Sequence, residues 1–233
     1  MRKLLIALVI ILVALVAADR IAVHIAQRKV ASRVAAAYSL ARPPSVTIQG
    51  FPFLTQLVAG NYQQVDISLA SVVRSGVDLR NLQARFDRVH APLRELVGAD
   101  RASVKVITAD HAAATALIPF PVVQRRLPRG ITLSQDGGGE LRLSGKLGYQ
   151  GLWVPVTAAV GLRVTGNAIE VVPHDVIVGG ALAVPPALLG SRLAFTLPVH
   201  DLPMHLKMTR VRVTAGGFEV SAAARDVAFE SRG

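Results

Sequence analysis

Val154-Pro155-Val156-Thr157-Ala158-Ala159-Val160-Gly161-Leu162-Arg163-Val164 is the stretch that decides the fold, because an aliphatic side chain stands at every second position. Alternation with period two is typical of a β-strand that buries one face. A strand of this length, about 36 Å at 3.3 Å per residue, is unusually long. It indicates a large, curved sheet. Gly166-Asn167 predicts a tight turn into a further strand over Ile169–Val172.

The same period recurs on both sides of this stretch. Val65–Val72 alternates in the same way, and a turn is predicted at Ser75-Gly76. In the next predicted strand, Val77–Phe86, the alternation of apolar and polar residues shifts by one position near Arg80-Asn81, as a β-bulge would cause. A further strand is predicted to start at Val104. The turn Gln135-Asp136-Gly137-Gly138-Gly139 is predicted to join two strands, Ile131–Ser134 and Glu140–Leu147. The last predicted strands are Arg192–Val199, Leu206–Thr214 and Phe218–Ala224.

Two segments have helical signals. Ile21–Ala37 carries aliphatic residues at helical spacing, and this stripe can face either a core or a membrane surface. Asp110 is predicted to cap a short helix over His111–Ile118, which Pro119-Phe120-Pro121 would end. We therefore predict an α+β fold, with one long curved antiparallel sheet of about nine strands wrapped on one long N-terminal helix.

An N-terminal hydrophobic segment precedes this domain. Met1-Arg2-Lys3 is followed by the unbroken apolar run Leu4–Ala18, which is short for a membrane-spanning helix and at the upper end of the length of a signal-peptide core. An anchor that continued to Ala26 would have to bury Asp19 and Arg20, which is unfavourable in a bilayer. Whether the segment is a signal peptide or an anchor, the rest of the chain is expected to be exported. The predicted division is 1–20 signal peptide or anchor, 21–228 α+β domain and 229–233 tail.

Composition limits the partners. The chain of 233 residues is 52% hydrophobic and 18% charged, which is too apolar for disorder. Its formal net charge of +11 suits anionic partners such as acidic lipid head groups. Nucleic acid fits poorly, because the arginines are scattered and aromatic residues are only 5%. The absence of cysteine excludes disulfides, zinc–thiolate sites and thiol catalysis.

Catalytic patterns are missing from the sequence. There is no G-x-S-x-G elbow, no H-E-x-x-H pair, no P-loop and no EF-hand loop. His200-Asp201 with His205 forms the one local histidine cluster, and polar residues at turns or strand ends are the simpler interpretation. We therefore predict no enzyme activity, no catalytic residue, no metal site and no cofactor.

The most distinctive local stretch is Gly50-Phe51-Pro52-Phe53-Leu54-Thr55-Gln56, in which two phenylalanines and a leucine surround a proline. It can be a hydrophobic lip that touches lipid or a plug that closes one end of the core, and the two are compatible.

This stretch, followed by Gly60-Asn61-Tyr62 and Val77-Asp78-Leu79, resembles the LmeA-like phospholipid-binding proteins of actinobacterial cell envelopes. Late in the chain, Asp201-Leu202-Pro203 and Val211–Val220 fit the same family. The resemblance implies an exported protein that binds phospholipid and has a fold similar to the tubular lipid-binding (bactericidal/permeability-increasing) modules. It implies no catalytic residue.

The leading hypothesis is thus a non-enzymatic, phospholipid-binding carrier or sensor of the cell envelope. It would hold acyl chains in an apolar groove between helix and sheet, with anionic phospholipid and the membrane surface as partners. A structural envelope protein with a self-filled core is the alternative, and an envelope hydrolase using His200-Asp201-His205 is a third. The predicted lipid-binding residues are Phe51, Pro52, Phe53, Leu54, Ile25 and Val34.

Overall fold

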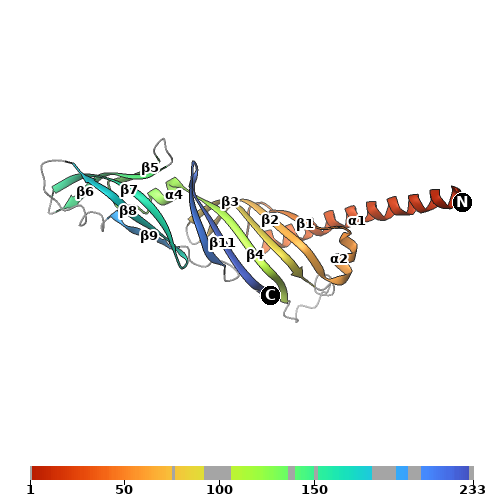
Figure 1. Ribbon diagram of the computed structural model, residues 1–233. Coiled ribbons are helices and arrows are strands. Elements are labelled where there is room, and N and C mark those ends of the chain that lie inside the picture. Colours follow the sequence, from red (N-terminus) through yellow and green to blue (C-terminus); the bar gives the residue numbers. More distant parts are fainter. Residues whose placement is uncertain are drawn as a thin grey trace. The chain divides into compact units, whose positions relative to one another are not determined.

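The computed structural model describes residues 2–74, 77–91, 106–135, 140–149, 152–179, 193–198 and 206–230. It begins with one continuous helix, α1 (Arg2–Ala37), which joins the apolar run to the predicted helix Ile21–Ala37 (Figure 1). Residues 2–18 of α1 are all exposed, whereas Val23 and Ala31 are buried. By length and composition, α1 is able to cross a membrane, as both a signal sequence and an anchor would.

Two antiparallel sheets follow, and one of them curls into a half-barrel (Figure 1). The first has the strand order β1-β2-β3-β4-β11-β10 and the second β5-β6-β7-β8-β9. The predicted class is confirmed: α+β, with a long N-terminal helix and a curved antiparallel sheet. The strands are β1 (Ser45–Gln49), β2 (Asn61–Arg74), β3 (Val77–His90), β4 (Val106–Pro119), β5 (Ile131–Gln135), β6 (Leu141–Tyr149), β7 (Leu152–Thr165), β8 (Ala168–Val178), β9 (Phe195–Pro198), β10 (Lys207–Thr214) and β11 (Gly217–Glu230).

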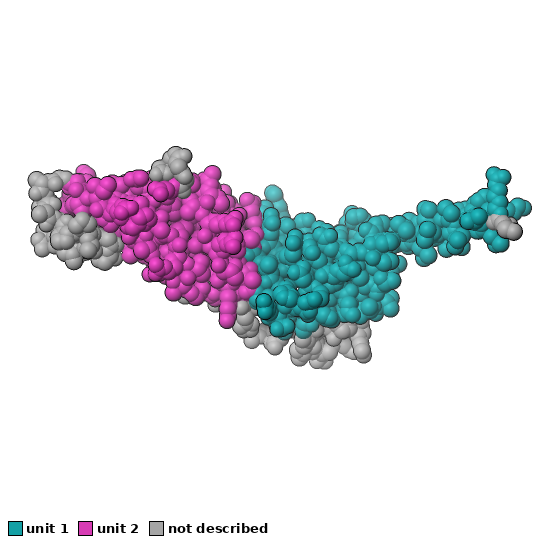
Figure 2. Space-filling model, viewed as in Figure 1, with its two compact units in different colours: residues 1–70, 83–114, 224–233 teal, residues 71–82, 115–223 magenta. Residues whose placement is uncertain are grey.

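The chain divides into two compact units, which Figure 2 colours separately. Unit 1 comprises residues 1–70, 83–114 and 224–233, and unit 2 comprises residues 71–82 and 115–223. Each unit is described by itself below.

Unit 2 has a core filled by its own side chains. The predicted face of β7 is confirmed, because Val154, Val156, Ala158 and Val160 are buried, and Leu162 and Val164 are partly buried and pack against the same cluster. The four buried residues lie opposite the buried Leu147, Leu143 and Leu141 of β6, since Val154 pairs with Leu147 and Ala158 with Leu143. Phe218 of β11 joins the same cluster, in edge-to-face contact with Phe120 at a ring-centroid distance of 5.8 Å.

One predicted element is wrong. His111–Ile118 is not a helix but part of strand β4, and the short helix α4 (Phe120–Gln124) begins only after it. Alanines favour helices, but here β4 is hydrogen-bonded between β3 and β11, and sheet pairing overrides the weak local preference. Asp110, the predicted cap, instead pairs with Arg88, whose Nε lies 2.6 Å from its Oδ2.

The remaining differences concern the number of sheets, elements that were not predicted and the extent of predicted ones: the described strands form two sheets rather than the predicted single sheet. Strand β1 and the short helix α2 (Phe53–Ala59) were not predicted. Strand β9 begins at Phe195, later than the predicted Arg192–Val199, whose two end residues lie outside the described ranges. Asn81 lies where a bulge was predicted and has a φ of +48°. The turns at Ser75-Gly76 and residues 136–139 lie outside the described residues, as does the predicted strand start at Val104.

Candidate functional site

The inward face of β1 and β2 in unit 1 carries aliphatic side chains. Val46 pairs with Ile67, and Ile48 pairs with Val65, so all four project from the same side of the sheet. Val46 is buried, but Ile48, Val65 and Ile67 remain partly exposed. This contrasts with β7 of unit 2, whose inward positions from Val154 to Val160 are all buried. We call Ile48, Val65 and Ile67 the inward apolar face.

Helix α1 packs against β1 through one stripe. Val23 and Ala31 are its buried members, and Val30 and Val34 lie on the same side at helical spacing but stay partly exposed. This stripe consists of alanine and valine, whose short side chains fill little of the space between the helix and β1. Aliphatic side chains of both α1 and β2 are therefore left incompletely covered.

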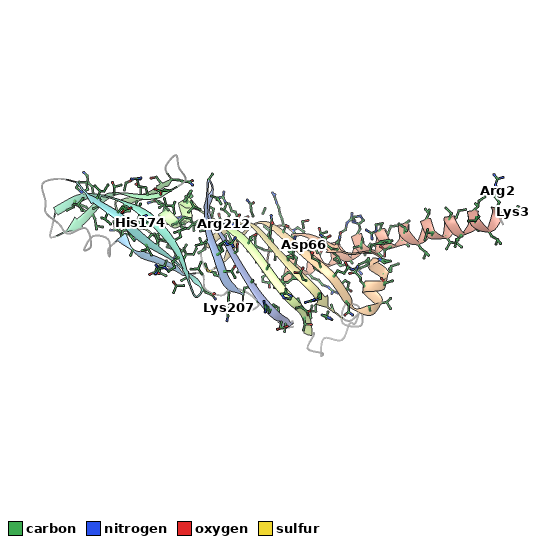
Figure 3. All side chains as sticks on the ribbon, in the orientation of Figure 1. Arg2, Lys3, Asp66, His174, Lys207 and Arg212 are labelled. Carbon is green, nitrogen blue, oxygen red and sulfur yellow. The ribbon has the colours of Figure 1, made fainter. Side chains whose placement is uncertain are left out.

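The opposite, outward side of the same strands is polar and centres on Asp66, labelled in Figure 3. Its Oδ2 accepts hydrogen bonds from Gln49 Nε2 at 2.9 Å and Gln64 Nε2 at 2.8 Å. Its Oδ1 accepts one from Arg85 Nε at 3.0 Å. Partial burial raises the pKa of Asp66, but these hydrogen bonds and the charge of Arg85 outweigh burial and place the pKa below 3.8. One carboxylate thus connects β1, β2 and β3.

The Gly50–Gln56 stretch forms a tight corner between β1 and β2. Gly50 has a φ of +102°, and a Cβ on it would lie 2.5 Å from Gln56 Nε2. Gln56 is buried, and its Oε1 accepts a hydrogen bond from the backbone N–H of Gln63 at 3.0 Å. Thr55 Oγ1 donates to the carbonyl oxygen of Pro52 at 2.8 Å. Most of this stretch therefore has a structural role.

Phe53 closes the apolar interior of this corner. It is 1% exposed, and its ring lies 6.2 Å from that of Tyr62. Tyr62 is itself buried, which raises the pKa of its hydroxyl. Within the part of the chain that the structure describes, this hydroxyl has no hydrogen-bond partner. Phe53 thus fits the plug interpretation of the stretch.

Helix α2 is held to α1 by a carboxylate. Pro52, at the N-cap position of α2, supplies no side-chain hydrogen bond. Instead, Asp19 of α1 accepts one from the backbone N–H of Leu54 at 2.8 Å, with its Oδ2 2.6 Å from Arg20 Nη2. Asp19 is only 2% exposed. The residue that interrupts the apolar run is therefore bound by protein.

The six predicted lipid-binding residues fall into three groups. Phe53 is buried; Leu54 and Val34 are partly exposed; Phe51, Pro52 and Ile25 are exposed. Phe51 is 59% exposed, and the Arg20 guanidinium lies over its ring at 5.1 Å from the centroid. The structure brings Phe51–Leu54 together with α1 at Asp19, whereas Ile25 lies on the opposite side of α1 from Val23 and Ala31.

Sequence reasoning missed the inward apolar face as a candidate site. The signal was present, because Val65 and Ile67 belong to the alternating stretch Val65–Val72. The alternation predicted which side of the strand these side chains project from, but not that they remain partly exposed. Asp19 was also missed, since its amide partner lies 35 residues away.

No group of three or more His, Asp or Glu residues that could hold a metal ion occurs in the described ranges. His200, Asp201 and His205, the basis of the hydrolase hypothesis, lie outside those ranges.

Comparison with known proteins gives one result. A family model described as LmeA-like phospholipid-binding matches residues 17–223, which is most of the chain. No curated protein and no solved structure matches significantly.

Proposed function

We propose, because the chain belongs to the LmeA-like phospholipid-binding family, that it is a non-enzymatic phospholipid carrier or sensor of the cell envelope. The acyl chains would lie against the inward apolar face, between α1 and strands β1 and β2. The family is one of phospholipid binding and not of enzymes. An N-terminal apolar helix that suits either a signal sequence or an anchor supports a location outside the cytoplasm.

The observation that carries this proposal is the incomplete cover of Ile48, Val65 and Ile67. Burying one methylene contributes about 0.8 kcal/mol. Eight methylenes of one acyl chain would therefore contribute about 6 kcal/mol, enough for a dissociation constant on the order of tens of micromolar. A second chain or a bound head group would tighten this further.

The head group is proposed to be anionic. The net charge of +11 favours anionic lipid over neutral lipid at the protein surface. Arginine is the best suited side chain for a phosphate, because its planar guanidinium donates two parallel hydrogen bonds.

A structural envelope role is the second candidate, and the filled core of unit 2 favours it for that unit. Val154, Ile169, Val171 and Phe218 are completely buried there. A unit closed in this way needs no ligand to fill it.

Native mass spectrometry of residues 19–233, after incubation with vesicles of phosphatidylglycerol and phosphatidylcholine, tests the proposal. The shortened chain keeps Asp19, and the described residues that it loses are all exposed. We expect one bound phospholipid per chain, with phosphatidylglycerol preferred.

The matched variants are Ile67→Trp and Ser68→Trp, adjacent positions on opposite faces of β2. Indole at position 67 would occupy the space proposed for an acyl chain, so bound lipid should fall severalfold. Ser68→Trp points outward and should bind as the unmodified chain does. No phospholipid on the unmodified chain, or equal binding by both variants, would contradict the proposal.

A further inference from the structure

Strand β10, the last in the order of its sheet, carries a row of cations. Its exposed cationic residues pair in register with every second residue of β11 and therefore project from one face of the sheet: Lys207, Arg210 and Arg212 stand opposite Ala223, Ser221 and Glu219. We call the three cationic residues the β10 row. Figure 3 labels its two ends, Lys207 and Arg212.

A bulge in β10 aligns this row. Met208 pairs with Ala222 and Arg210 with Ser221, so Thr209 is an extra residue in the register. Its Oγ1 donates a hydrogen bond to the carbonyl oxygen of Ser221 at 3.3 Å. Without the extra residue, the alternation of a regular strand would turn Arg210 away from the face of Lys207. The bulge thus places all three cations on the same face.

The other face of β10 is held in the core of unit 2. Met208 is 7% exposed, and Val211 and Val213 pack against the same buried cluster. The backbone N–H of Met208 also donates to Oδ1 of Asn167, in the turn between β7 and β8, at 3.4 Å. Because this face is fixed, the strand cannot rotate to turn its charges away from one another.

No carboxylate neutralises the β10 row in the part of the chain that the structure describes. Arginines of other strands have such partners, as Arg85 has in Asp66 and Arg88 in Asp110. Among the described ion pairs, by contrast, none includes a member of the β10 row, although Glu219 of β11 lies opposite its last residue. Unpaired cations on one face repel one another and attract anions.

The spacing of the row fits an extended anionic surface. The three residues are spread over roughly 15 Å of strand, whereas a single phosphate is bound by groups that converge on it. Single-stranded nucleic acid would require aromatic side chains beside the cations, and the row has none. Charged side chains also keep an edge strand from pairing with another sheet, but this effect does not require the cations to share one face.

From these observations we propose that the β10 row holds unit 2 against the head groups of an anionic phospholipid bilayer. Each cation contacts a different phosphate, and no acyl chain enters the protein there. The contact goes beyond the phospholipid site proposed for unit 1, because it lies in the other unit and recognises the bilayer surface instead of one lipid molecule.

Flotation of residues 19–233 with vesicles tests this contact, because this chain lacks the apolar run that would hold every variant at a membrane. The described residues that it loses are all exposed. We expect binding to vesicles of phosphatidylglycerol and phosphatidylcholine, little binding to phosphatidylcholine alone, and release by salt. One Lys or Arg near such a surface strengthens binding about fivefold, so Arg210→Gln with Arg212→Gln should weaken binding about 25-fold.

Arg126→Gln with Arg129→Gln is the matched control. Both arginines are exposed in the turn that follows α4, and the loss of positive charge is the same. Charges remote from the contact are screened by salt, so this pair should weaken binding by about twofold at most.

Equal weakening by the two pairs, or no preference for phosphatidylglycerol, would overturn the inference. So would release of the bound chain by inorganic phosphate at constant ionic strength, because this would indicate a site for a single phosphate. Native mass spectrometry separates this contact from the proposed function. The Arg210→Gln with Arg212→Gln variant should still carry one phospholipid, whereas an unmodified chain that floats with vesicles but carries none would contradict only the site in unit 1.

Discussion

Gly50 shows how much of the corner before β2 depends on one residue. Its φ of +102° is strained for any other L-residue, and the buried Gln56 side chain fills the place of a Cβ. Gln56 cannot move away without losing its hydrogen bond from Gln63. The string Gly50–Gln56 is thus constrained mainly by structure, and Phe51 is its most exposed aromatic residue.

We therefore expect Gly50→Ala to lower the free energy of unfolding by about 2 kcal/mol. Gly166→Ala is the matched control, because Gly166 also has positive φ but no atom lies within 4 Å of the place that the alanine methyl group would take. That variant should lose about 1 kcal/mol. Urea unfolding of both variants measures the difference. Equal losses of unfolding free energy would show that the Gln56 side chain moves aside without cost.

Phe51 and Phe53 also show where sequence stops being informative. Both are phenylalanines flanking one proline, yet one is 59% and the other 1% exposed. Their separation depends on Tyr62 packing against Phe53 and on Asp19 fixing the start of α2. These are tertiary contacts, which no local pattern specifies.

At the scale of elements, strands were predicted best where most of one face is buried. The alternation of Val154–Val164 matches β7 because burial on one face requires it. The helix predicted over His111–Ile118 is wrong because a small alanine side chain can be buried equally well in a helix or in a strand. Its neighbours β3 and β11 decide the outcome.

Three neighbouring strands meet at Asp66, and this connection should depend on pH. The pKa of Asp66 is lowered in the folded chain, so its stabilising effect is complete at pH well above 3.8. The effect is lost as the pH falls below 3.8 through the folded-state pKa. Asp66→Asn should lower stability at pH 7 by about 1 kcal/mol, because solvent access weakens such a pair.

The difference between Asp66→Asn and the unmodified chain should shrink below pH 3.8. Asp226→Asn, at an exposed position of β11, serves as the control for a simple change in net charge. Thermal unfolding from pH 7 to pH 2 measures both. A difference that stays constant over this range would mean that the Asp66 hydrogen bonds contribute nothing that depends on its charge.

At the scale of the whole molecule, both units combine fully buried apolar side chains with partly exposed ones. Unit 2 encloses a cluster in which Ile169, Val171 and Leu193 are fully buried. In unit 1, Ile48, Val65 and Ile67 remain partly exposed. The sequence predicted the class of fold and the family, but it could not distinguish these two interiors, because both use the same aliphatic alternation.

The most direct measurement is cross-linking of residues 19–233 with a phospholipid that carries a photoactivatable group in its acyl chain, followed by mapping of the labelled peptides. We expect labels on β1, β2 and the sheet-facing side of α1, around Ile48, Val65, Ile67 and Val34. Labels confined to β6, β7 and β8 of unit 2, or to outward-facing positions such as Ser68, would contradict the proposed site.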